Sequence, residues 1–156
     1  NKFGLKEKIL MLTVHLMTKQ DQAYVMPKVQ QFYASDAVDH AVPAEILQQT
    51  FEQAVSDNPL ITGLILEADG EKAGYAYITH MYSTEAGPCI IIEELFIEPS
   101  MRGKGLGQAF FHWLFDAYPN TARFRLEVTP ENPRAKALYE RLGFVPLGYH
   151  QMIRER

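Results

Sequence analysis

The sequence predicts an α+β domain with a mixed, mostly antiparallel central sheet of six to seven strands and about four flanking helices. Its 156 residues have the length of one domain, which we expect to span residues 1–156. Hydrophobic residues make up 47% and charged residues 22% of the chain, which is enough apolar material for a core. Strand-like and helix-like segments follow one another in the order β-α-α-β-β-β-α-β-α-β, and the last segment reads as one or two strands.

The first apolar stretch, residues 9–17, is predicted to be an edge strand. Lys2, Lys6 and Lys8 precede it and give it a loose likeness to a signal peptide. No small-residue cleavage site follows, however, and His15 interrupts the apolar run. A strand is therefore the better interpretation.

Two helices are expected next. Asp21 can cap a helix that runs to about residue 34, and Pro27 lies inside this stretch, where it can kink the helix or delay its start. The second helix runs from Pro43 to about residue 55. Its apolar residues fall at helical spacing: Ile46, Leu47, Phe51 and Ala54.

A hairpin and a further strand follow these helices. Residues 60–68 and 72–82 read as strands, and Asp69-Gly70 between them is a strong two-residue turn signal. Residues 89–97 form an apolar run that contains two adjacent acids and stops before Pro99. These segments supply the antiparallel part of the predicted sheet.

The second half of the chain alternates helices and strands. Residues 105–118 predict a helix that is apolar almost all round and hence buried. A strand is expected at residues 124–128 and a short helix at residues 133–142. Residues 144–153 are expected to form one or two final strands, broken by a proline and a glycine.

Composition excludes several classes of protein. The net charge of −4 is too acidic for a generic nucleic-acid binder, and no apolar run reaches the roughly 18–20 residues of a membrane span. The single cysteine, Cys89, excludes an internal disulfide framework and a multi-cysteine zinc site, and it suits a reducing compartment. Residues 1–100 carry 6 basic and 14 acidic side chains, whereas residues 101–156 carry 9 and 5. This asymmetry has two explanations. Either the charged side chains are simply solvated at the surface, or the last third of the chain binds an anion while the rest binds a cation.

A glycine-rich turn is the most informative segment. Gly103, Gly105 and Gly107 stand between a strand and a buried helix, beside Arg102 and Lys104, so backbone N–H groups and the helix dipole are open to an anion. A Walker-type loop fails because no Gly-Lys-Ser/Thr is present, and the dinucleotide fingerprint fails because a glutamine occupies the place of its third glycine. The stretch does match the Arg/Gln-x-x-Gly-x-Gly/Ala loop that grips the pyrophosphate of coenzyme A.

A second motif opens the last predicted helix. Asn132 is a good N-cap, and Asn132, Ala135 and Tyr139 share one helix face because they lie at offsets 0, 3 and 7. Gly143-Phe144 ends the helix. Taken alone, Tyr139 is better explained as a core aromatic residue.

Together, the two motifs resemble the GNAT superfamily of acyl-CoA-dependent N-acyltransferases, over residues 90–144 and, by element order, over nearly the whole chain. The resemblance implies that the strand before the turn splays at a bulge and pairs with the pantetheine arm. It also implies that amides of the turn hold the pyrophosphate, that Asn132 contacts the pantetheine or phosphate region, and that Tyr139 protonates the departing thiolate. The residues implied to bind acetyl-CoA are Leu95, Phe96, Ile97, Arg102, Gly103, Lys104, Gly105, Leu106, Gly107, Gln108, Asn132 and Tyr139.

Acyl transfer to an amine also needs a proton acceptor, because an amine of pKa about 10 is mostly protonated at pH 7. Glu93 and Glu94 lie side by side just before the expected bulge. Adjacent strand residues point to opposite faces, so we expect only one of them to meet the substrate. Resemblance to the polyamine-acetylating branch of the family favours Glu93. The alternative is that both acids are solvated or paired with basic side chains.

Other candidate residues are weaker. Cys89 can serve as a nucleophile in a two-step mechanism, but it lies roughly 20 Å before Leu95 along an extended strand and is better explained as a small buried side chain. His40 can line an amine pocket, although a plain loop histidine is the better explanation. The five histidines show no metal-ligand spacing, so no metal is expected.

We therefore expect a cytoplasmic N-acetyltransferase that moves an acetyl group from acetyl-CoA to a primary amine by direct attack in a ternary complex. The acceptor is expected to be a small molecule, polyamine-like or otherwise cationic, and the chain is expected to form a homodimer. No nucleic-acid or membrane partner is expected. The alternative is a non-catalytic acyl-CoA-binding or regulatory domain on the same fold.

Overall fold

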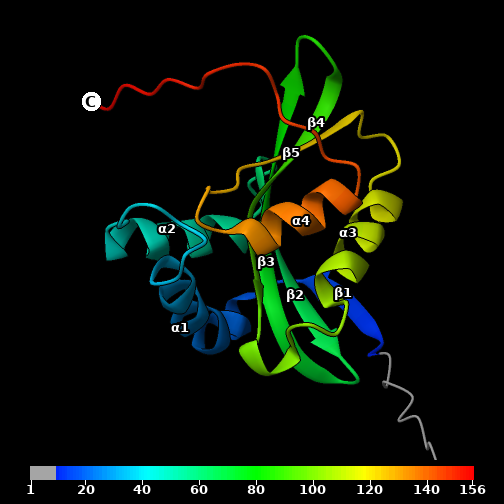
Figure 1. Ribbon diagram of the computed structural model, residues 1–156. Coiled ribbons are helices and arrows are strands. Elements are labelled where there is room, and N and C mark those ends of the chain that lie inside the picture. Colours follow the sequence, from blue (N-terminus) through cyan, green and yellow to red (C-terminus); the bar gives the residue numbers. More distant parts are fainter. Residues whose placement is uncertain (1–9) are drawn as a thin grey trace, which may run out of the picture.

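The computed structural model describes residues 10–156, which fold as a five-stranded sheet with helices on both faces (Figure 1). The strands lie in the order β1-β2-β3-β4-β5, the first four antiparallel and β5 parallel to β4. The predicted α+β class and mostly antiparallel sheet are confirmed. The strands are β1 (Leu12–Leu16), β2 (Ile61–Ala68), β3 (Glu71–Ser83), β4 (Gly87–Ile97) and β5 (Arg123–Leu126). The helices are α1 (Gln22–Tyr33), α2 (Ala44–Ala54), α3 (Leu106–Ala117) and α4 (Pro133–Arg141).

The predicted number of six to seven strands is wrong for the described residues, which form five. Residues 144–153 contain no strand. Phe144 still packs against Phe111. The Tyr149 hydroxyl donates to Glu85 Oε1 at 3.3 Å, and the end of the chain then leaves the body of the molecule as an extended tail (Figure 1). Pro146 cannot donate to a sheet ladder, and Gly148 weakens a strand. Met152 and Ile153 remain 93% and 87% exposed, so these two apolar side chains pack against no neighbouring strand.

The first strand and the first hairpin form as predicted. β1 is an edge strand that pairs with β2, while Lys2, Lys6 and Lys8 lie outside the described residues. At the turn between β2 and β3, Asp69 has φ +51° and Gly70 has φ +82°. Two positive φ angles in succession are what a two-residue hairpin turn of this kind requires.

The start of α1 differs from the prediction that Asp21 caps this helix. A short 3-10 turn, Lys19–Asp21, precedes α1, and the backbone N–H of Thr18 donates to Asp21 Oδ2 at 2.8 Å. Asp21 itself has helical backbone angles and makes no side-chain cap bond to α1. Pro27 lies inside α1 and does not end it.

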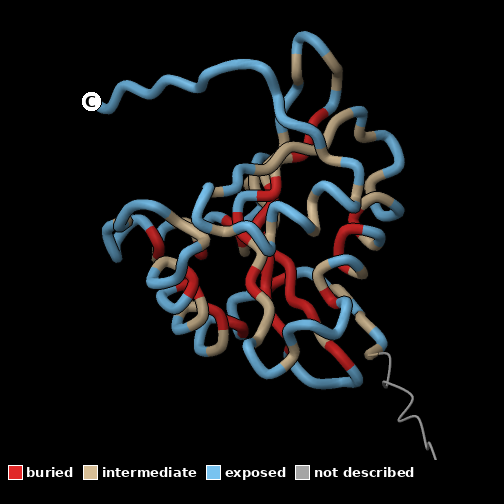
Figure 2. Tube along the Cα trace, viewed as in Figure 1, coloured by how far each residue is buried: buried red, intermediate tan, exposed pale blue. Residues whose placement is uncertain are grey.

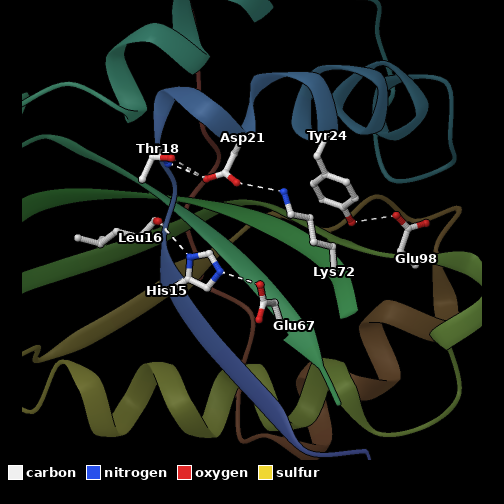
Figure 3. A network of polar contacts seen from close by, with 8 residues as sticks. All are labelled: His15, Leu16, Thr18, Asp21, Tyr24, Glu67, Lys72 and Glu98. Carbon is white, nitrogen blue, oxygen red and sulfur yellow. Dashed lines mark hydrogen bonds and ion pairs between the residues drawn. The ribbon is translucent and has the colours of Figure 1, made fainter. Parts of the chain in front are cut away.

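Polar contacts tie this end of α1 to the sheet (Figure 3). Lys72 Nζ, at the start of β3, donates to Asp21 Oδ1 at 3.1 Å and lies 5.0 Å from the centre of the Tyr24 ring. The Tyr24 hydroxyl donates to Glu98 Oε1 at 2.8 Å, just after β4. These contacts anchor α1 to the ends of β3 and β4.

Each face of the sheet has its own hydrophobic core, and the buried residues follow the central strands (Figure 2). On one side, which we call the α3 face, Phe110, Phe111 and Leu114 of α3 meet Leu64, Leu66, Ala76, Ile78, Ile90 and Ile92 of the sheet. On the other side, the α1–α2 face, Val25, Val29, Leu47 and Phe51 meet Ile65, Tyr75, Tyr77 and Phe96. Side chains on the two faces therefore alternate along β2 and β3, as expected of a sheet buried on both sides.

Candidate active site

A β-bulge interrupts β4 in its middle. Tyr77 of β3 pairs with Glu94, whereas the next residue, Ile78, pairs with Ile92, so Glu93 has no partner on β3. A bulge of this kind adds one residue to one strand and re-aims the side chains beyond it. The bulge that the resemblance implied for this strand is confirmed.

β4 also loses its other neighbour at this point. β5 pairs with β4 from Cys89 to Ile92, and no described strand pairs with that edge of β4 past the bulge. Leu95, Phe96 and Ile97 therefore have one backbone edge that pairs with β3 and one that no described strand covers. An uncovered strand edge is a template for pairing with an extended ligand.

The bulge places both acids on the same face of the sheet, so the prediction that they face opposite ways is wrong. Thr79 lies two residues beyond Tyr77 in β3, and hence on the α1–α2 face. The Thr79 hydroxyl donates to Glu93 Oε1 at 2.8 Å. The hydroxyl of Tyr75, which is also on that face, donates to Glu94 Oε1 at 2.7 Å.

The two carboxylates nevertheless have different surroundings. Glu93 is exposed, whereas Glu94 is only 6% exposed and also accepts a 2.9 Å hydrogen bond from the Tyr33 hydroxyl. Burial raises the pKa of the Glu94 carboxyl, an effect that the two tyrosine hydroxyls oppose and the neighbouring Glu93 charge reinforces. The Tyr77 hydroxyl is buried nearby and has no hydrogen-bond partner among the described residues. Glu93 is thus the acid that is available to a ligand.

A cleft of about 930 Å³ opens on the bulge. It collects residues from β4, the glycine-rich turn, the segment from β5 to α4, and the loop between α1 and α2. Of the residues predicted for the site, two do not line it, Glu94 and Lys104. The predicted residues that do line the cleft are Glu93, Leu95, Phe96, Ile97, Arg102, Gly103, Gly105, Leu106, Gly107, Gln108, Asn132 and Tyr139.

The three positions of the turn require glycine for different structural reasons. Gly103 has φ +74° and Gly105, which immediately precedes α3, has φ +79°, so both adopt the left-handed conformation that favours glycine. Gly107 has no such angle, but a Cβ there would lie 3.2 Å from Leu138 Cδ2 of α4. Two glycines therefore shape the backbone at the positive end of the α3 dipole, and the third lets α3 and α4 pack closely.

Arginines supply positive charge to the cleft. Arg102 Nε donates to the Ile97 carbonyl at 2.9 Å, and its guanidinium lies 5.6 Å from the centre of the Phe96 ring. Arg134 and Arg141 of α4 also line the cleft, and sequence reasoning did not name them. The basic excess of residues 101–156 was the one available signal for them.

Tyr139 and Asn132 are placed by α4. The Tyr139 ring packs edge-on against Phe111 at 5.7 Å and Phe144 at 6.0 Å between ring centres. Burial raises the pKa of Tyr139, so its hydroxyl is protonated at neutral pH. Asn132 Oδ1 accepts the Ala135 backbone N–H at 3.1 Å, which confirms the predicted N-cap.

The loop between α1 and α2 forms an acidic wall of the cleft. Asp36, Asp39 and His40 line it, and His40 Nδ1 pairs with the Asp39 carboxylate. The Thr129 hydroxyl donates to the Asp36 carbonyl at 2.9 Å, which ties this loop to the segment that leads into α4. His40 is therefore placed where the sequence expected an amine pocket to lie.

The structure does not support Cys89 as a nucleophile. Cys89 is buried and does not line the cleft, and burial raises its thiol pKa, which disfavours the nucleophilic thiolate. Residues 10–156 contain no group of three or more His, Cys, Asp or Glu side chains that could hold a metal ion. Within the same residues, no helix is long and apolar enough to cross a bilayer.

Known proteins are similar to this chain in sequence. A model of the family described as acetyltransferase (GNAT) matches residues 26–144. The chain is 31% identical over 97 residues to a thialysine N-epsilon-acetyltransferase of Sus scrofa, a match that covers 56% of this chain and 57% of the relative. It is 29% identical over 103 residues to a Bacillus subtilis protein provisionally named a ribosomal protein bS18-alanine N-acetyltransferase, with 65% of each chain covered. The chain thus spans less than two thirds of the length of either relative.

The fold of this chain is also similar to that of a solved structure. The aminoglycoside N-acetyltransferase AAC(6')-Iy, in complex with the bisubstrate analogue CoA-S-monomethyl-acetylneamine, superposes with a TM-score of 0.74. The two chains are 18% identical, and the superposition covers 94% of this chain and 99% of the other.

Proposed function

Because the chain belongs to the acetyltransferase (GNAT) family, we propose that it transfers an acetyl group from acetyl-CoA to a primary amine by direct attack in a ternary complex. We propose this activity for residues 1–156 as one domain. A cytoplasmic location goes with the proposal, because the one cysteine of the chain is buried and unpaired, as suits a reducing compartment.

The acetyl-CoA side of the cleft is proposed to run from β4 to the start of α3. The uncovered backbone edge of Leu95, Phe96 and Ile97 suits the amide groups of the pantetheine arm. The left-handed Gly103 and Gly105 shape the turn at the α3 N-terminus, where free backbone N–H groups attract a pyrophosphate. The arginines of the cleft add charge-assisted contacts to the same phosphates.

The amine is proposed to enter on the acidic side of the cleft. An ammonium group is attracted there by Glu93, Asp36 and Asp39, and it must lose a proton before it can attack the thioester. Glu93 is the group we assign to accept that proton, because it is exposed in the cleft while Glu94 is buried behind it. The Thr79 hydroxyl, which donates to Glu93 Oε1, holds the carboxylate in place.

Tyr139 is the group we assign to protonate the departing thiolate. Its hydroxyl is protonated at neutral pH, and its ring is fixed between Phe111 and Phe144. The C–S bond of the thioester breaks as the C–N bond of the amide forms, and coenzyme A leaves as the free thiol. The second proton of the nitrogen passes to solvent, which also takes the proton from Glu93 and restores the proton of Tyr139. The protein thus supplies one proton acceptor and one proton donor to a reaction whose electrophile is the thioester itself.

One observation supports this function above the others: a single cleft is lined by the glycine-rich turn, by the exposed Glu93 and by Tyr139. The test is release of free coenzyme A thiol from acetyl-CoA, measured against a panel of primary amines. Turnover with any amine supports the enzyme, whereas acetyl-CoA binding without turnover would favour the non-catalytic acyl-CoA-binding domain.

A further inference from the structure

A second hollow lies on the α1–α2 face, beside the cleft. It is an open groove of about 440 Å³ between α2 and the neighbouring ends of β2 and β3. Four α2 residues one and two turns apart form its outer wall: Ile46, Gln49, Thr50 and Gln53. Leu60 and Thr79 line the side toward the sheet.

The groove is uncharged. No Lys, Arg, Asp or Glu lines it, and its polar groups are amides and hydroxyls. His80, which also borders it, is bonded to the Thr62 hydroxyl at 2.9 Å, and burial lowers its pKa, so it is neutral at pH 7. Apolar surface is exposed there as well, since Ile46 and Leu60 are 48% and 62% exposed. The groove contrasts with the acidic wall of the cleft.

Thr79 joins the groove to the cleft. It lines the groove, and its hydroxyl donates to Glu93 Oε1, while Glu93 lines the cleft. A molecule whose amine lies at Glu93 can therefore extend past Thr79 into the groove. This hydrogen-bonded pair is the link between the two hollows.

We infer that the groove binds the uncharged remainder of the acceptor, a chain of amides with small apolar side chains that carries the reactive amine at its end. This inference rests on the proposed function. The amides and hydroxyls of Gln49, Gln53 and Thr50 can exchange hydrogen bonds with amide groups of such a chain, and Ile46 and Leu60 cover its apolar side chains. The first residues of a polypeptide have this chemistry.

A long polyamine fits the groove less well. Its second and third ammonium groups would lose solvent contact next to neutral side chains, without a carboxylate to pair with. The range of expected acceptors, polyamine-like or otherwise cationic, is therefore reduced to molecules with a single charged end. The positive charge of the acceptor is recognised at Glu93, and its length is recognised in the groove.

The experiment compares acceptors of different length with acetyl-CoA held at saturation. Alanine amide and the tripeptide Ala-Leu-Ala amide have the same charged amine and differ in the length of the uncharged peptide. 1,3-Diaminopropane and spermidine differ in length and in one further ammonium group. We expect kcat/KM to rise about tenfold or more from alanine amide to the tripeptide amide, as for other apolar subsites. From the diamine to spermidine we expect no such rise.

A pair of variants on α2 locates the effect. Gln49→Trp fills the groove and should abolish the gain from the longer peptide, so that kcat/KM for the tripeptide amide no longer exceeds kcat/KM for alanine amide. Gln48→Trp, one position along the same helix and outside the groove, should keep the gain. Melting temperatures of both variants check that each is folded.

Three results would overturn the inference alone: equal kcat/KM for the short and long peptides, a gain that survives in Gln49→Trp, or a gain with spermidine that matches the peptide gain. Thiol release with none of these four acceptors but with another amine of the panel would also overturn this inference alone. Thiol release with no amine of the panel would overturn the proposed function, and this inference with it.

Discussion

Glu93 and Glu94 are neighbours in the chain and lie on the same face of the sheet, yet one carboxylate is exposed in the cleft and the other is buried under two tyrosine hydroxyls. The bulge at Glu93 produces this arrangement, because it turns the side chains beyond it by one position. Two acids that look equivalent in the sequence therefore have separate expected roles, and different measurements separate them.

The first prediction concerns catalysis. Glu93→Gln should lower kcat/KM for the amine by about 10²–10⁴-fold and flatten its rise near neutral pH, since a general base contributes that much. Wild-type kcat/KM should also fall with added salt, because salt screens attraction between exposed charges. The measurement is a pH–rate profile at saturating acetyl-CoA. Glu94→Gln is the matched control, and a Glu93→Gln enzyme with the wild-type profile would remove Glu93 from the mechanism.

The second prediction concerns stability and Glu94. Burial raises the pKa of this carboxyl above its ordinary value of 4.5, so the unfolded chain releases the proton at lower pH than the folded one. Between those two pKa values the unfolded state binds fewer protons, and the free energy of unfolding falls as pH rises, by about 1.4 kcal/mol per unit of pKa difference. Glu94→Gln has no carboxyl to titrate at this position, so it removes this fall in the free energy of unfolding.

Thermal unfolding from pH 4 to pH 8 checks the second prediction. The melting temperature of Glu94→Gln should rise relative to the wild type as pH increases. Glu52→Gln, which removes an exposed carboxylate of α2 that does not line the cleft, serves as the control. A wild type that becomes more stable than Glu94→Gln over this range would contradict the raised pKa.

The third prediction separates backbone strain from coenzyme binding. Gly105→Val and Gly70→Val place a branched residue at φ +79° and +82°, and no protein atom lies within 4 Å of either added Cβ. Each should cost about 1–2 kcal/mol of stability. Only Gly105→Val should raise the KM for acetyl-CoA, by tenfold or more, because its side chain would block the turn of the cleft. Equal KM values in the two variants would refute the proposed pyrophosphate site.

The fourth prediction concerns Tyr139. Tyr139→Phe keeps the ring that packs on Phe111 and Phe144, so stability and acetyl-CoA affinity should stay within a few-fold of the wild type. Loss of the proton donor should lower kcat by about 10²–10⁴-fold. Tyr118→Phe is the control, since Tyr118 is half-buried at the end of α3 and does not line the cleft. If kcat stays near the wild-type value, water protonates the thiolate.

The fifth prediction is that the chain forms a homodimer. The tail exposes large apolar side chains, among them Val145, Tyr149, Met152 and Ile153, and exposed apolar clusters commonly mark association surfaces. Light scattering at micromolar concentration should give twice the chain mass of 17.8 kDa. The double variant Met152→Ser, Ile153→Ser should move the mass toward that of one chain, and a wild type that already has the mass of one chain would contradict the prediction.

Local signals in the sequence predicted local structure well. Asp69-Gly70 encodes a turn because both residues tolerate positive φ, and Asn132 encodes the start of α4 because its side chain caps a nearby N–H. Gly103 and Gly105 likewise act through their own backbone angles. These features depend on a few consecutive residues, so a single chain is enough to recognise them.

Features that depend on distant partners were the ones missed. The facing of Glu93 and Glu94 follows from their register against Tyr77 and Ile78, which no pattern within β4 reveals. Asp21 looked like a helix cap, but its carboxylate binds Thr18 and Lys72, the latter far away in the sequence. The final segment has strand-like composition, yet no described strand pairs with it. In each case tertiary contacts override local propensity.

The extra residue in β4 also changes which positions of the strand face each of the two cores. Before position 93 the even-numbered side chains Ile90 and Ile92 enter the α3 core, and after it the odd-numbered Leu95 and Ile97 take over that role. Deletion of Glu93 would therefore do more than shorten the strand. It would remove the bulge and make Ile92 and Glu94 neighbours in a regular ladder. Leu95, Phe96 and Ile97 would keep their partners on β3 and their cores, so the deletion would take away the proposed base and the local bend of β4 while it leaves the register of the strand intact.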